Sequence, residues 1–312
     1  MTLLIQYTLI FASVLILVAL GGCIAEHSGV INLGLEGIMV IGALGGALMM
    51  RYLPSTSAFV VVAGSILMAI LFGMLYSCLL GVACINFKAD QTLVGTALNL
   101  LGTAAATVFV KAINTAANPD NHSSEIEYIA QRKMFILKLG GFEFNWFMLI
   151  AALAVAGVFV MLYKTRFGLR LMACGEHPQA ADSVGINVYK MRWAGVLISG
   201  GLGGLGGICY ILAGTSLWKF EVGVGGFGFL ALAVMIFGQW KPTRIALAAL
   251  LFGFFRALSN VYAGFGFLVA LNLPGNVYNM IPYIISLVVL ALTSKHSRAP
   301  KAEGIPYDKG QR

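Results

Sequence analysis

YKTRFGLRLMACGEHPQAADSVGINVYKMR, residues 163–192, is a polar stretch between two strongly apolar ones. It holds more basic than acidic residues, namely Lys164, Arg166, Arg170, Lys190 and Arg192 against Glu176 and Asp182. Short basic loops beside membrane spans stay on the cytoplasmic side. The stretch therefore predicts a cytoplasmic loop from which the apolar segments on either side can be oriented.

The overall composition is that of a polytopic membrane protein. Hydrophobic residues make up 59% of the 312, charged residues only 10%, and the mean hydropathy is +0.89. A soluble globular domain of this composition would expose large apolar patches. The 38 glycines suit close helix packing and broken helices in lipid. The net charge of +8 gathers in the central loop and in residues 294–312, so it indicates membrane orientation rather than nucleic-acid binding.

The chain contains nine apolar segments that approach or exceed the roughly 20 residues needed to span a bilayer. They are residues 3–24, 35–50, 58–85, 92–113, 146–162, 193–213, 227–240, 245–263 and 277–293. Residues 265–273 are too few to cross alone. The sequence thus predicts an all-α polytopic protein of about nine (eight to ten) helices. The membrane domain covers residues 1–293, and a basic cytoplasmic tail covers 294–312.

Counting spans from the central loop predicts the side on which each connection lies. The polar segment 114–145 falls outside, while Lys88, Lys241, Arg244 and the basic tail fall on the cytoplasmic side, in agreement with the charge rule. The same count places the amino terminus outside unless residues 35–50 form a re-entrant helix. The side of Met1 is left open at this point.

Two glycine-containing segments suggest an internal repeat. Gly29-Val-Ile-Asn-Leu-Gly-Leu-Glu-Gly37 leads into one short apolar helix, and Gly223-Val-Gly-Gly-Phe-Gly-Phe-Leu230 leads into another. Paired short, glycine-interrupted segments in two halves point to a transport site at the repeat interface. The alternative is that glycine is simply common in membrane helices.

The chain has no pattern typical of an enzyme. Neither a phosphate-binding loop ending in Gly-Lys-Ser/Thr nor a Gly-x-Ser-x-Gly elbow occurs in the sequence. Its four histidines are scattered, and it has no Cys-x-x-Cys. We therefore predict no catalytic residues, no metal site, no cofactor and no ATPase activity of its own.

Ionisable groups at membrane depth are costly and are therefore functional candidates. Glu36 begins the second apolar segment, where the helix dipole alone could account for a carboxylate. Arg256, with Asn260 one turn on, either lines the substrate path or binds a backbone carbonyl. Asn99 either joins helices or reads substrate hydroxyls. The tentative substrate path comprises Asn32, Glu36, Asn99, Phe227, Arg256 and Asn260, with Phe227 as a ring that could stack on a base.

The centre of the basic loop predicts a short helix. Pro178 is favourable in a first turn, and Gly185 is suited to the position after a helix end. Small Ala180 and Ala181 on its surface would let it lie in a groove of a partner protein. The alternative is a solvated loop.

Several motifs together resemble one family. The pattern Glu-x-x-x-Ala-Ala-x-x-x-Gly from Glu176 to Gly185 resembles the coupling-loop signature of ABC importer permeases. The run LISGGLGGLGG at 197–207 is similar to a helix of the permeases for ribose, branched-chain amino acids and nucleosides. SGVINLGLEG at 28–37, FGFLALAVMIFG at 227–238 and GIPYDKG at 304–310 resemble the nucleoside and simple-sugar branch. One departure is Gln239-Trp240-Lys241, where a Gly-Arg-Trp-like run is expected.

The resemblance implies a permease subunit in a bacterial inner membrane that carries nucleosides or simple sugars. Its implied partners are cytoplasmic ABC ATPase subunits that use the ATP, a second homologous permease, and a lipid-anchored or periplasmic substrate-binding protein. The implied ATPase-coupling residues are Gly175, Glu176, Ala180, Ala181 and Gly185. The alternative function is a stand-alone secondary transporter or channel, for which Glu36 is the one carboxylate suited to ion coupling.

Overall fold

The structure is a computed structural model that describes residues 2–53, 57–140, 142–214, 217–265, 274–293 and 299–310. The predicted spans fall within these ranges. Residues 266–273, and residues 294–298 and 311–312 of the predicted tail, lie outside the described residues.

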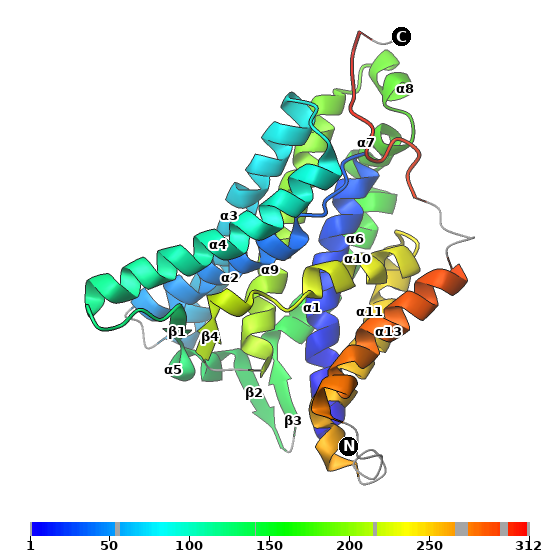
Figure 1. The fold of residues 1–312 in the computed structure, drawn as a ribbon. Coiled ribbons are helices and arrows are strands. Elements are labelled where there is room, and N and C mark those ends of the chain that lie inside the picture. Colours follow the sequence, from blue (N-terminus) through cyan, green and yellow to red (C-terminus); the bar gives the residue numbers. More distant parts are fainter. Residues whose placement is uncertain are drawn as a thin grey trace.

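The described chain is predominantly helical (Figure 1). Seven helices are long and apolar enough to cross a membrane: α1 (Thr2–His27), α2 (Leu35–Tyr52), α3 (Ala58–Gly81) with a π-helical extension (Val82–Asn86), α4 (Gln91–Ala117), α6 (Trp146–Lys164), α9 (Val188–Gly214) and α11 (Pro242–Val261). Two further helices, the short α10 (Phe227–Phe237) and α13 (Gly275–Thr293), match the remaining predicted segments. The prediction of an all-α polytopic membrane protein is confirmed.

Helices α1 and α9 form the centre of the bundle. Nearly all of α1 from Ile10 to Glu26 is buried, whereas α3 and α6 expose most of their apolar surface at the periphery. Glycines allow the central helices to approach one another closely. Gly42 of α2 and Gly73 of α3 both lie against Gly204 of α9. The glycine-rich run that the sequence places in α9 is therefore where three helix backbones meet.

The predicted outer segment 114–145 folds into small elements that the sequence analysis did not predict. Strand β1 (Glu125–Glu127) pairs antiparallel with β4 (Leu217–Lys219), and β2 (Ile136–Leu139) pairs with β3 (Phe142–Asn145). Short helical turns accompany them: α5 (Ile129–Arg132), η2 (Lys133–Phe135), η3 (Phe220–Val222) and, after α11, η4 (Tyr262–Gly264). These strands are too short to show the alternation by which strands are recognised in a sequence.

The predicted cytoplasmic loop is also helical. It forms α7 (Arg166–Glu176) and α8 (Pro178–Ser183), and its last basic residues lie in the first turns of α9. Figure 1 shows α7 and α8 at the opposite end of the bundle from the strands. The amino terminus lies at the strand end, where Gln6 Nε2 donates to the Glu143 carbonyl over 3.2 Å. The structure thus places the start of α1 on the side predicted to be outside.

Two helices begin inside the bundle rather than at its ends. After α1, residues 28–34 turn back, and Leu35 at the start of α2 lies against Gly203, midway along α9. Helix α10 likewise begins within the bundle. It ends near the carboxyl-terminal end of α1, and just after it the Trp240 carbonyl contacts His27, the last residue of α1. This explains why residues 35–50 and 227–240 are short as spans. Helix α2 ends at the strand end, where Arg51 donates to Asn114 beside β1, so residues 35–50 are not re-entrant.

The chain after α10 departs from the predicted apolar span 227–240. Helix α10 ends at Phe237, and Gln239 and Trp240 have positive φ of 52° and 55°. Such angles are uncommon for residues other than glycine and are costly. Trp240 is buried, and its indole N–H donates to the Glu26 carboxylate. The sequence analysis expected a Gly-Arg-Trp-like run at this position, and here Trp240 joins the turn to α1.

Candidate functional site

The starts of α2 and α10 meet through one carboxylate. Glu36 accepts hydrogen bonds from the Gly226 N–H at Oε1 and from the Gly228 N–H at Oε2, each over 2.7 Å. Glu36 also lies in the first turn of its own helix. The first turn of a helix carries a partial positive charge and unpaired N–H groups. A single side chain therefore stabilises two helix N-termini, and the two predicted repeat segments are in contact.

The α10 start depends on glycine for its shape. Gly225 and Gly226 have φ of 61° and 80°, a conformation that other residues rarely adopt. At Gly228 a β-carbon would lie 2.5 Å from the Glu36 nitrogen, so a larger residue would separate the two helices. The sequence G-V-G-G-F-G is thus required both by the turn and by the close approach of α2.

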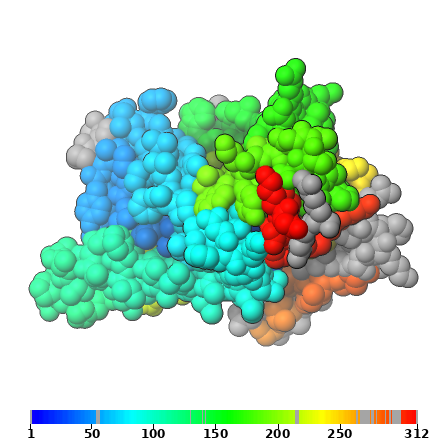
Figure 2. All heavy atoms as spheres, turned by 90° about the horizontal axis from the view of Figure 1, so that it is seen from above, coloured from blue at the N-terminus to red at the C-terminus, as the bar shows by residue number. Residues whose placement is uncertain are grey.

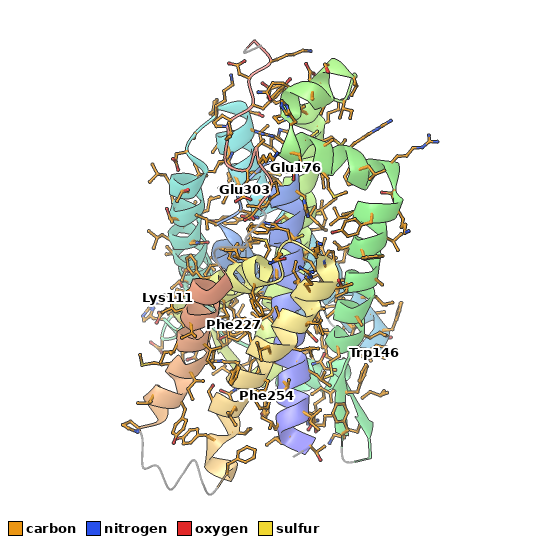
Figure 3. The ribbon with its side chains drawn as sticks, turned by 90° about the vertical axis from the view of Figure 1, so that its right-hand side faces the viewer. Lys111, Trp146, Glu176, Phe227, Phe254 and Glu303 are labelled. Atoms are coloured by element: carbon orange, nitrogen blue, oxygen red, sulfur yellow. The ribbon has the colours of Figure 1, made fainter. Side chains whose placement is uncertain are left out.

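A cluster of aromatic and polar side chains surrounds this junction. The Phe227 ring lies 4.6 Å from the Tyr210 ring and 5.4 Å from the Arg256 guanidinium. The Tyr283 hydroxyl donates to the Gly225 carbonyl over 2.6 Å. Figure 3 shows Phe227 near the middle of the bundle, well below Glu176 and Glu303. Glu36, Tyr210, Arg256 and Tyr283 are all half-buried, so polar groups remain accessible at this depth.

Phe227 itself is fully buried, between Tyr210 and Phe11. Its ring face is therefore covered by protein in this conformation, and the two tyrosines present more accessible ring surface. The sequence analysis missed Tyr210 and Tyr283. A signal was present, since a tyrosine in a membrane helix needs a partner for its hydroxyl when buried.

The three asparagines of the predicted path lie in different surroundings. Asn99 Nδ2 donates to the Leu33 carbonyl over 2.8 Å, and its Oδ1 accepts from the Gly37 N–H over 2.9 Å. Asn32 is buried and donates to Ser199 Oγ over 2.8 Å. Asn260 is exposed on α11. Asn32 and Asn99 thus hold the segment before α2, and a role in contacting substrate stays a prediction for all three.

At the other end of the bundle, α8 has the geometry expected for a docking helix. Pro178 occupies its first turn, and Gly185 after it has a φ of 84°. Glu176, Ala180 and Val184 are exposed, Val184 to 74%. Gly175 is buried against the His27 carbonyl, where a β-carbon would not fit. The predicted small surface is corrected at Ala181, which is 4% exposed and packs inward against Cys174 and Tyr307.

Comparison with known proteins gives one consistent result. Residues 4–290 match the family described as branched-chain amino acid transport system / permease component. The chain is 40% identical to the guanosine ABC transporter permease protein NupQ of Bacillus subtilis, covering 100% of this chain and 98% of that one.

Two other relatives extend this result. The chain is 39% identical to the nucleoside ABC transporter permease protein NupC of Lactococcus lactis, covering 97% of this chain and 96% of that one. A putative glucose ABC transporter permease protein of Haloferax volcanii, TsgC13, is 34% identical, covering 82% and 76%. No solved structure matches the chain.

Proposed function

Because the chain belongs to the branched-chain amino acid transport system permease family, we propose that it is the membrane subunit of an ABC importer for nucleosides. The observation that carries the substrate class is its full-length similarity, near 40% identity, to permeases named for guanosine and nucleosides. As a multi-pass protein of the cell membrane, it supplies the pathway and acts as a transport component rather than as an enzyme.

The junction cluster has the chemistry that a nucleoside requires. A nucleobase presents a flat ring with polar edges, and a ribose presents hydroxyls. Half-buried Tyr210 and Tyr283 offer ring surface for stacking. Arg256 lies beside them as a hydrogen-bond donor, while Glu36 holds the start of α10 in place. Mostly apolar sites with a few convergent polar groups are typical of small-molecule recognition. We assign substrate passage to this cluster.

ATP hydrolysis is assigned to separate subunits, because the sequence lacks a phosphate-binding loop. The proposed assembly contains two ABC ATPase subunits, a second related permease and a substrate-binding protein on the outer side. The exposed surface of α8 and of the residues that flank it, with Glu176, Ala180 and Val184, is the proposed ATPase contact. Closure of the ATPases would displace α8, and α9, which begins five residues later, would transmit the displacement to the junction.

Simple sugars are the second candidate substrate, supported by the similarity to the Haloferax volcanii permease named for glucose. A stand-alone ion-coupled carrier has weaker support. Such carriers need a carboxylate that takes up and releases an ion or proton. Both oxygens of Glu36 already accept hydrogen bonds from the backbone of α10, which indicates a structural role for the carboxylate.

The test is to co-express the tagged chain with the ATPase, second permease and binding protein of its own host. The purified complex in proteoliposomes should take up radiolabelled guanosine only with ATP, and guanosine should stimulate ATP hydrolysis more than glucose or leucine does. Recovery of the chain without an ATPase, or uptake that is independent of ATP, would contradict the importer proposal. Uptake of glucose in preference to guanosine would change the proposed substrate from nucleosides to simple sugars and would leave the ATP-driven importer mechanism in place.

The junction is tested separately by Arg256→Met, with Arg244→Met near the start of the same helix as the matched control. Removing the Arg256 charge should raise the KM for nucleoside by about tenfold, as expected for the loss of roughly 1.4 kcal/mol of binding free energy. The Arg244 variant should leave the KM unchanged. An unchanged KM in both variants would move the substrate path away from the cluster.

A further inference from the structure

The described carboxyl-terminal residues fold back onto the bundle. Residues 299–310 of the predicted basic tail, here called the strap, therefore pack against the protein instead of extending into solvent. The Ala302 N–H donates to the Gly175 carbonyl, at the end of α7, over 2.8 Å. Ala302 and Tyr307 are only 6% and 4% exposed. Figure 2 shows these red residues lying between the green α7–α9 region and the cyan end of α3.

Arg192 is the centre of this contact. Its Nη1 donates to the Ile305 carbonyl of the strap over 2.9 Å, and its guanidinium lies 6.0 Å from the Tyr307 ring. On its other side it packs against Gly29, where an added β-carbon would be 2.8 Å from Nη2. Arg192 is 1% exposed, which is unusual for a residue predicted to mark a cytoplasmic loop. One side chain thus contacts both the strap and the turn that follows α1.

Two other contacts hold the strap, one at its middle and one near its end. Lys88, between α3 and α4, forms an ion pair with Asp308 at 2.8 Å, and both side chains are about 40% exposed. Gly304 lies against Ile31, where an added β-carbon would be 2.8 Å from the Ile31 side chain. An exposed ion pair adds little stability, so its effect is mainly to set position. The strap therefore contacts α7, α9, the α3–α4 connection and residues 28–34.

Residues 28–34 lead directly to the junction. The Ile31 N–H donates to Gln91 at the start of α4, and the Leu33 carbonyl accepts from Asn99. Glu36, which holds α10, follows three residues later. A displacement of α7 and α8 can therefore reach the α2–α10 junction through the strap and residues 28–34, in addition to the route along α9.

We propose that residues 299–310 transmit movement of α7 and α8 to residues 28–34, with Arg192 as the positioning residue between them. This inference rests on the proposed function, in which a partner ATPase displaces α8. The strap is assigned to coupling within the chain and not to binding of the ATPase. Loss of the strap should therefore leave ATP hydrolysis by the complex intact while nucleoside uptake falls.

The test compares Arg192→Met and a chain ending at residue 298 with Lys190→Met, an exposed basic residue two positions earlier on α9. Both strap variants should still co-purify with the ATPase and hydrolyse ATP. Nucleoside uptake should fall by at least about tenfold, within the usual range of coupling between sites. Lys190→Met should behave like the wild type. Unchanged uptake in the truncated chain, or loss of the ATPase from it, would overturn the proposal.

A second measurement does not depend on substrate and keeps failure of the two proposals distinct. Hydrogen exchange on the isolated chain should speed up in residues 28–34 and 175–185 together when the strap is removed or Arg192 is replaced. Tyr307→Ala should have the same effect with less disturbance of the fold. If the wild-type complex fails to import nucleosides but this joint response is present, the proposed transport function is wrong and the proposed role of the strap stands. Absence of a response in residues 28–34 would contradict the strap.

Discussion

The α2–α10 junction and the end of the bundle formed by α7, α8 and the strap, here called the coupling end, both hold a charged side chain away from water, but they stabilise it differently. At the junction, both oxygens of Glu36 accept a backbone N–H over 2.7 Å. At the coupling end, Arg192 Nη1 donates to the Ile305 carbonyl, and its Nε and Nη2 lack a hydrogen-bond partner within the described residues. Glu303 Oε2 at this end likewise lacks a hydrogen-bond partner within the described residues, and the Glu26 carboxyl group of α1 interacts with it electrostatically.

The contrast indicates which region changes shape. A buried polar atom without a partner loses its hydration and gains nothing in return, so the region that contains it is closer in free energy to alternative arrangements. The Glu36 carboxylate, which is bound at both oxygens, is not such a group, whereas Arg256 Nε in the surrounding cluster is one among the described residues. The contrast therefore concerns the Glu36 contact itself: it behaves as a fixed link between α2 and α10, while the contact of Arg192 with the strap is the one that a partner protein can rearrange.

Glu36→Ala tests most directly whether the hydrogen bonds of Glu36 hold α2 and α10 together. It removes the acceptor of two N–H groups at the α10 start, and each orphaned buried donor costs about 1–3 kcal/mol. We expect the largest loss of thermal stability of any variant considered, together with loss of uptake. Thermal unfolding of the purified chain, followed by tryptophan fluorescence, measures the first effect.

Glu36→Gln is the matched control, because its one carbonyl oxygen can accept from only one of the two N–H groups. It should fall between the wild type and Glu36→Ala in unfolding temperature. If Gln behaved like the wild type while Ala did not, the side-chain volume and not the hydrogen bonds would hold the link.

Sequence reasoning identified Glu36 and the two glycine-containing segments but not their contact. Membrane spans are readable because about 20 apolar residues are needed to cross lipid, whatever the tertiary structure. Which helix starts meet is decided by the third dimension. No local pattern states that Glu36 binds the amides of residues 226 and 228, 190 positions further along.

Gly185→Val tests the coupling end, and its expected effect on stability is smaller. A β-carbon at Gly185 would meet nothing within 4 Å, but the φ of 84° would cost roughly 1–2 kcal/mol in any other residue. The turn after α8 should change shape while the bundle stays folded. We expect uptake to fall by about tenfold, as for other coupled sites, with little change in unfolding temperature.

Gly157→Val on α6 provides the control, since its β-carbon also meets nothing within 4 Å and its φ is negative. It should transport normally. Glu176→Lys, which reverses an exposed charge beside α8, should uncouple transport as Gly185→Val does. Normal transport by both of these variants, which flank α8, would refute the assignment of α8 as the ATPase contact.

The coupling end also shows what the sequence hides. Composition and charge predicted a basic loop and a basic tail, and the proline and glycine predicted α8. The burial of Arg192 and the docking of the strap could not be predicted, because a positive charge near a membrane span is normally solvated. Its burial depends on a carbonyl and a ring more than 110 residues away.

Asn99→Ala tests whether Asn99 only holds the segment before α2 or also contacts the substrate. The change removes hydrogen bonds to Gly37 and Leu33, so the unfolding temperature should fall by less than for Glu36→Ala, where a charged acceptor is lost. Uptake per folded molecule, with the folded amount taken from size-exclusion chromatography, should stay within about twofold of the wild type if the side chain binds only backbone groups and not substrate. A selective rise in KM would instead place Asn99 on the substrate path.

The smallest expected effect is a pH dependence of the strap. Burial raises the pKa of Glu303 from an ordinary value of 4.5 to about 7, beside Glu26, with His27 and Glu176 at the same end of the bundle. A carboxyl group with a raised pKa in the docked state favours docking while it is protonated. Docking should therefore weaken as the pH rises from about 4.5 to about 7 and should then level off.

Glu303→Gln should remove this dependence, because the amide stays neutral at every pH. The measurement is the ratio of hydrogen-exchange rates in residues 299–310 between wild type and variant at each pH, so that the intrinsic pH dependence of exchange cancels. The ratio should be near its lowest value at pH 5 and should rise several-fold by pH 8, as the ionised Glu303 faces Glu26 in the wild type alone. A ratio that stayed constant would mean that ionisation of Glu303 does not weaken docking of the strap, and the contrast between the two regions would then rest on Arg192 alone.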